Sequence, residues 1–151
     1  MILLLLLAFL LDFYISFYFS FLNPFLFVIT VLTFLILKNK KKDLSIIFIS
    51  LIIYDLLFSK TLFLNLFTIL FLYEIIKYFK RHLNLTFPIF FLLLSFIFIL
   101  YLTIEYILLL ETKLIYLPFS FLFTQILLSF PLNITYGVIL YTILGLKFKK
   151  H

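Results

Sequence analysis

Residues 51–81 read LIIYDLLFSKTLFLNLFTILFLYEIIKYFKR, and this stretch decides the fold. It holds two apolar segments, separated by the polar break Ser59-Lys60 and closed by the basic cluster Lys77 to Arg81. An apolar helix needs roughly 17–25 residues to cross a bilayer. Together with the apolar residues just before it, the stretch predicts two membrane spans, at about 44–59 and 61–79, joined by a short turn.

The rest of the chain repeats this pattern of apolar segments and short breaks. Hydrophobic residues make up 67% of the 151 residues, against roughly 45–50% in a soluble domain. The mean hydropathy is +1.36. We therefore expect an all-α integral membrane protein, a single transmembrane domain over residues 1–151 that forms a bundle of six transmembrane helices with short loops. The four further spans are predicted at about 2–22, 24–38, 87–110 and 118–146.

Positive charge alternates between the breaks. Ten of the 12 Lys and Arg residues lie at Lys38 to Lys42, Lys77 to Arg81 and Lys147 to Lys150, whereas the breaks between these hold only Lys60 and Lys113. Cytoplasmic loops of membrane proteins are enriched in Lys and Arg. The pattern therefore predicts a multi-pass protein with both termini in the cytoplasm. The first apolar segment resembles a signal-peptide core but has no basic residue before it, so we expect it to be a retained span.

Four acidic residues fall within the predicted spans, and each needs an explanation because a carboxylate is costly in lipid. Glu74 has Lys77 one turn later, which predicts an ion pair. Asp12 has no cation near it in sequence, so it is either protonated or meets polar groups from another helix or a partner protein. Asp55 and Glu105 both lie about one turn from the outer ends of their spans.

The two outer lysines lie at the same predicted depth as Asp55 and Glu105. We therefore expect a polar cluster of Asp55, Lys60, Glu105 and Lys113 in the outer leaflet. The alternative, that both carboxylates simply reach the head groups, is equally compatible with the sequence.

In the last predicted span, Gln125, Ser129, Asn133 and Gly137 recur every four residues. They form a polar stripe of small and polar side chains that we expect to face another helix. Pro131 interrupts the stripe and predicts a kink, with Ser129 or a water bonding the freed carbonyl.

Several function classes find little support in the composition. The chain has no Cys, and its two histidines, His82 and His151, have no nucleophile or metal ligand at useful spacing. The basic residues cluster at helix ends rather than on one face, so they predict contact with anionic membrane lipids and not with nucleic acid. We expect no catalytic residues, no metal and no cofactor.

The stretch from Asn23 to Arg81 resembles the rod shape-determining protein MreD family of bacterial inner-membrane proteins. The shared features are a Pro at the start of the second span, a basic turn, Asp55 followed by Leu56 and Leu57, a brief turn, and the cluster Lys77 to Arg81. The final span, with Asn133 and a basic tail, is also similar.

The resemblance implies a non-enzymatic scaffold of the cell-elongation machinery in the bacterial cytoplasmic (inner) membrane. Its implied partners are an MreC-like bitopic protein, an MreB-like cytoskeletal protein and peptidoglycan synthases such as RodA.

The main alternative is the substrate-binding subunit of an energy-coupling-factor vitamin transporter, which is also a small six-span bundle. Such subunits present small residues on the first helix for docking, where this chain has Ala8 alone. A membrane enzyme of lipid metabolism is a third possibility.

Overall fold

A computed structural model describes residues 1–18, 24–37, 41–58, 63–111 and 118–148. These residues form six helices and no strand. The helices are α1 (Ile2–Tyr18), α2 (Leu26–Leu37), α3 (Lys41–Phe58), α4 (Leu64–His82), α5 (Phe87–Glu111) and α6 (Phe119–Phe148). The all-helical class is confirmed, and each predicted span overlaps one of these helices. Lys38, Lys60 and Lys113 lie outside the described residues.

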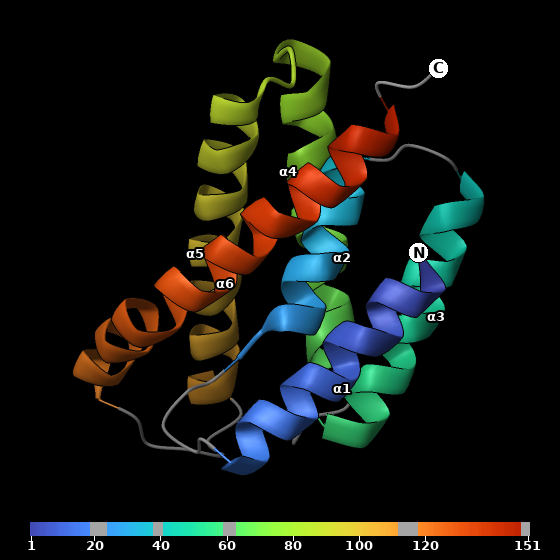
Figure 1. Ribbon diagram of the computed structural model, residues 1–151. Helices are drawn as coiled ribbons and strands as arrows, with labels where there is room; N and C mark the ends of the chain where they lie inside the picture. The colour runs from blue at the N-terminus through green and yellow to red at the C-terminus, as the bar shows by residue number, and fades with distance from the viewer. Residues whose placement is uncertain (19–23, 38–40, 59–62, 112–117, 149–151) are drawn as a thin grey trace.

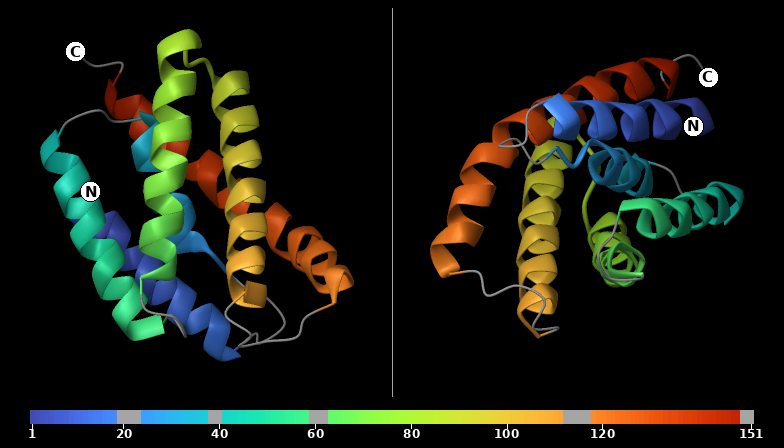
Figure 2. Two further views of the ribbon diagram at one scale, coloured as in Figure 1. Left: turned by 180° about the vertical axis from the view of Figure 1, so that it is seen from behind. Right: turned by 90° about the horizontal axis from the view of Figure 1, so that it is seen from below.

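The short helix α2 is the centre of the bundle. It packs against α1, α4, α5 and α6, and Figures 1 and 2 show these helices around it. Every residue of α2 from Leu26 to Ile36 is buried. With 12 residues it is only about 18 Å long. A helix that is apolar on all sides is stable only when it is enclosed, and here the neighbouring helices enclose it.

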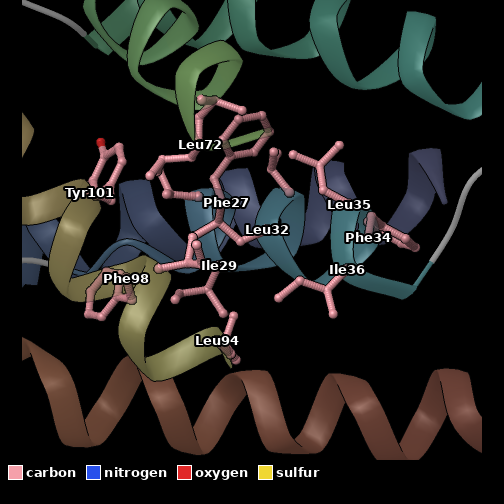
Figure 3. Close-up of a cluster of buried hydrophobic side chains, with 14 of the residues drawn as sticks. Phe27, Ile29, Leu32, Phe34, Leu35, Ile36, Leu72, Leu94, Phe98 and Tyr101 are labelled. Carbon is pink, nitrogen blue, oxygen red and sulfur yellow. The ribbon is translucent and has the colours of Figure 1, made fainter. Parts of the chain in front are cut away.

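The core forms where α2 meets α4 and α5. Figure 3 shows Phe27, Ile29 and Leu32 of α2 beside Leu72 of α4 and Leu94 and Phe98 of α5. The ring of Phe27 also stacks on Tyr54 of α3, with ring centroids 4.4 Å apart. Aromatic and branched side chains thus supply the close contacts of the interior.

The outer faces of the helices are apolar as well. On α1, Leu3 is 76% exposed and Phe17 is 74% exposed, and α4, α5 and α6 expose further Phe and Leu side chains. Two helical stretches in the described part of the chain, Phe87–Glu111 and Leu122–Leu144, have the length and the hydropathy to cross a membrane. Shorter apolar stretches lie at Ile2–Tyr18, Leu26–Leu37 and Leu44–Leu57.

The basic residues of the described helices gather at one end of the bundle. The last turns of α2, α4 and α6 and the first turns of α3 and α5 lie in the upper half of Figure 1. This end carries Lys77, Lys80 and Arg81 of α4 and Lys147 in the last turn of α6. We call it the basic end. Among the described residues, the basic positions therefore share one end of the bundle.

Helix α6 crosses the bundle obliquely and makes its closest approach at Gly137. A Cβ at this position would collide with the buried side chain of Leu94 in α5 and lie 3.3 Å from Ile29 in α2.

Pro131 lies inside α6 without ending it, and the right-hand view of Figure 2 shows the helix changing direction part-way along. The Ser129 hydroxyl donates to the carbonyl of Gln125 at 2.6 Å, so it does not bond the carbonyl that Pro131 frees. The prediction for Ser129 was wrong in this detail.

Candidate functional site

The side chain of Asp12 lies in the interior, against the first turn of α2. Its Oδ1 accepts a hydrogen bond from the backbone N–H of Leu26, and its Oδ2 accepts one from Phe27, both at 2.8 Å. The first N–H groups of a helix have no partner within the helix, and the helix dipole favours negative charge there. The N-terminus of α2 is therefore the polar group from another helix that the sequence required for Asp12.

Asn133 of α6 completes this arrangement from the opposite side. Its Oδ1 accepts a hydrogen bond from the N–H of Phe25 at 3.0 Å, and its Nδ2 donates to the carbonyl of Ser129 at 2.8 Å. Three successive amides, at residues 25, 26 and 27, are thus bonded by side chains from α6 and α1. The start of the central helix is fixed by two other helices.

Asp55 plays the same part for α4. Its Oδ1 accepts a hydrogen bond from the side-chain amide of Asn65 at 2.6 Å, and its Oδ2 accepts one from the N–H of Leu66 at 2.9 Å. The residue in front of α4, Phe63, has a φ of 63° and gives no side-chain cap. A left-handed conformation is unfavourable for such a residue, so the cap from α3 stabilises a strained turn.

The Asp55 cap extends to α5 through Tyr101. The Tyr101 hydroxyl donates to Oδ1 of Asn65, and both side chains are buried. Asp55, Asn65 and Tyr101 therefore link three helices in one hydrogen-bonded chain. Every member has a partner, which is the condition under which a buried polar network stabilises a fold.

Two helical pairs thus use the same device. Asp12 in α1 caps α2, and Asp55 in α3 caps α4. In each pair a carboxylate from the first helix bonds amides at the start of the second, which fixes the angle at which the two helices meet. The two caps are the most specific polar feature of the described residues, and we take them as the candidate site.

Glu105 lies one helical turn after Tyr101, and its carboxylate interacts electrostatically with that of Asp55. Its Oε2 is buried and has no hydrogen-bond partner among the described residues. The predicted cluster of Asp55, Lys60, Glu105 and Lys113 stays a prediction, because Lys60 and Lys113 lie outside the described residues. Asp55 itself bonds uncharged amides. Asp55 is also 0% exposed, so the alternative that it reaches the head groups was wrong.

The polar stripe of α6 faces the interior. Ser129, Asn133 and Gly137 are buried and Gln125 is half-buried. This agrees with the expectation that the stripe faces other helices. Its function in the described structure is to bring α6 close to α5 and to cap α2.

The Glu74 and Lys77 side chains form the expected ion pair, with 3.4 Å between Nζ and Oε2. Glu74 is 67% exposed and Lys77 is 43% exposed, so water screens the pair and its contribution to stability is small.

Sequence reasoning missed Asn65 and Tyr101. The signal for Asn65 was a lone amide in an apolar run, ten residues after Asp55. The signal for Tyr101 was its position one turn before Glu105, on the same helix face. Within the described part of the chain, no group of three or more His, Asp or Glu side chains could hold a metal ion.

A scan of protein-family models, a search of curated proteins and a search of solved structures each find no match to this chain.

The first prediction concerns the Asp12 cap. We expect Asp12→Leu to lower the free energy of unfolding by about 2–6 kcal/mol, because two buried N–H groups would lose their acceptors at about 1–3 kcal/mol each. Asp12→Asn retains one acceptor and should cost less. Thermal unfolding of the purified protein in detergent measures both effects. The control Leu10→Ala changes an exposed position of α1. A loss for Asp12→Leu no larger than that of the control would contradict the cap.

The second prediction concerns the hydrogen-bonded chain between α4 and α5. In a double-mutant cycle, Asn65→Leu and Tyr101→Phe should each destabilise the protein, and the double variant should be more stable than the sum predicts by at least about 0.5 kcal/mol. Thr103→Val serves as a control, because the Thr103 hydroxyl is exposed and bonds only its own helix, at the Ile99 carbonyl. We expect Thr103→Val and Asn65→Leu to be additive. Additivity of the Asn65 and Tyr101 changes would refute the link.

Proposed function

We propose that this chain is a non-enzymatic scaffold subunit of the bacterial cell-elongation complex, embedded in the cytoplasmic membrane as a six-span bundle. The observation that carries the proposal is the Asp55 cap. In the stretch that resembles the MreD family, the aspartate, the turn and the following span are the shared features. In this structure those features hold α3, α4 and α5 together. A scaffold requires such rigidity, since it acts by presenting fixed surfaces to partners.

The proposed placement in the membrane is supported by the distribution of apolar and charged groups. The side faces of the bundle expose large apolar side chains, which lipid tolerates and water does not. Helix α6 has 30 residues and is about 45 Å long, which exceeds a hydrocarbon core of about 30 Å unless the helix is tilted. Figure 1 shows α6 running obliquely across the other helices.

The short helices are compatible with the same placement. Helix α2 is only about 18 Å long, but its neighbours enclose it, so it need not meet the full lipid thickness alone. Asp12 and Asn133 accept hydrogen bonds from its first amides, so these N–H groups are not left without acceptors where the helix begins in an apolar medium.

The contacts favour the scaffold over the transporter subunit. Docking of a transporter subunit through its first helix would need small residues on an open face, but Ala8 is 0% exposed. Asp55, one of the two carboxylates that a cationic ligand would need beside Glu105, is buried and bonded to Asn65. The Asp12, Asp55 and Asn133 side chains thus bond helix to helix.

The proposed topology predicts where reporter tags will lie. Tags inserted at residue 40 and fused after residue 150 should both report a cytoplasmic position, because cationic side chains resist transfer across lipid. A tag near residue 60 should report the outer side. Paired alkaline phosphatase and fluorescent reporters measure this in cells. Opposite locations for residues 40 and 150 would overturn the six-span arrangement.

The proposed role predicts the partners and the phenotype. Cross-linking in membranes of the native cell should recover an MreC-like protein or peptidoglycan synthases such as RodA with the tagged chain, and depletion should abolish rod shape. Wild-type protein and Thr103→Val should restore shape. Asp55→Leu, at matched membrane levels, should restore it poorly because the cap of α4 is lost. Recovery of ATPase and coupling subunits, with normal cell shape on depletion, would overturn the proposal in favour of the transporter.

A further inference from the structure

A basic pocket lies at the basic end, between the last turns of α2 and α4. It has a volume of about 140 Å³. Its wall combines three cationic side chains, Lys77, Lys80 and Arg81, with the apolar or aromatic side chains of Leu35, Tyr73 and Ile76. No acidic side chain is among these six residues. The pocket is distinct from the Asp12 and Asp55 caps, which lie toward the opposite end of α2 and α4.

Lys80 is the fixed cation of this pocket. Its Nζ donates to the carbonyl of Leu35 at 3.1 Å, in the last turn of α2. Carbonyls in the last turn of a helix have no partner within the helix, and the dipole there attracts positive charge. Lys80 therefore holds the end of α2 against α4. Burial lowers the pKa of its ammonium group, because desolvation penalises the charged form. A bound anion would offset that penalty.

Lys77 and Arg81 stand one turn apart on α4 and provide the more accessible charges. The Lys77 Nζ lies 3.4 Å from Oε2 of Glu74, which is long for an ion pair, and the Glu74 side chain is exposed. Arg81 is exposed. With Glu74 included, the group has a net charge of +2, since three cations face one carboxylate. An arginine guanidinium and a lysine ammonium are the groups that bind phosphate oxygens best in proteins.

We propose that this pocket binds the phosphate head group of an anionic phospholipid. Its polar wall matches the phosphate, and the half-buried ring of Tyr73 suits the glycerol, whereas Leu35 and Ile76 of the same wall are buried. Basic pockets between helices at the cytoplasmic side of a membrane bind such head groups. The inference rests on the membrane placement proposed above, but not on the role in cell elongation.

Lipid binding by the purified protein tests the proposal. The protein in neutral detergent is titrated with phosphatidylglycerol, with phosphatidylcholine or with inorganic phosphate, and the melting temperature and the lipid retained in native mass spectra are recorded. We expect phosphatidylglycerol to raise the melting temperature and to be retained at a defined stoichiometry. Phosphatidylcholine should have little effect. An equal rise of the melting temperature with inorganic phosphate would refute the proposal that the ligand is a lipid. An equal rise with phosphatidylcholine would refute the proposal that the cationic side chains select an anionic head group.

Variants separate the pocket from general charge attraction. Lys77→Gln with Arg81→Gln should weaken phosphatidylglycerol binding roughly 30-fold, or about fivefold for each cation removed. Lys77→Arg with Arg81→Lys retains both charges and should keep most of the binding, which also covers the case in which the first variant folds poorly. Lys149→Gln with Lys150→Gln removes the same charge outside the six residues of the pocket wall, so it should lose much less binding than the Lys77 and Arg81 variant. An equal loss in this last variant would refute the pocket.

The outcome is independent of the scaffold proposal. Absence of phosphatidylglycerol binding with the expected partner recovery would refute only the lipid-binding pocket. Normal lipid binding with no recovery of elongation partners would refute only the scaffold role.

Discussion

The structure depends on one constraint, that the backbone N–H groups at the start of a buried helix must have acceptors. Where a helix begins inside an apolar medium, neither water nor the helix itself provides them. This chain solves the problem for α2 and α4 with carboxylates from the preceding helices, Asp12 and Asp55. A buried carboxylate without a partner and a buried N–H group without an acceptor would each destabilise the fold. Here each carboxylate accepts hydrogen bonds from such N–H groups.

The hydrogen bonds at the two ends of α2 also explain why so short a helix can be the centre of the bundle. Helix α2 has apolar residues on every side, so its own sequence gives it no preferred orientation. The bonds from Asp12 and Asn133 set its start, and the bond from Lys80 to Leu35 sets its end. Directional polar contacts at both ends therefore define the position of a helix that dispersion and shape alone would leave poorly specified.

The positions of the helices were predictable from the sequence, because apolar segments and basic breaks are local signals. The need of Asp12 for a polar partner was predictable too. The identity of the partners was not. The amides of Leu26, Phe27 and Leu66 carry no side-chain signature, and whether they meet a carboxylate depends on how two helices fold back on each other. Lysines were expected as partners because charge is visible in a sequence and backbone polarity is not.

The complete enclosure of α2 also bears on how the chain is made. In the membrane placement proposed above, the 12 residues of α2 are fewer than a full span needs, and the amides at residues 26 and 27 take their acceptors from Asp12. That placement favours entry of the first two helices into the bilayer as a joined hairpin. Biogenesis of the core then waits until the later helices have been synthesised, because α4, α5 and α6 supply most of the wall around it.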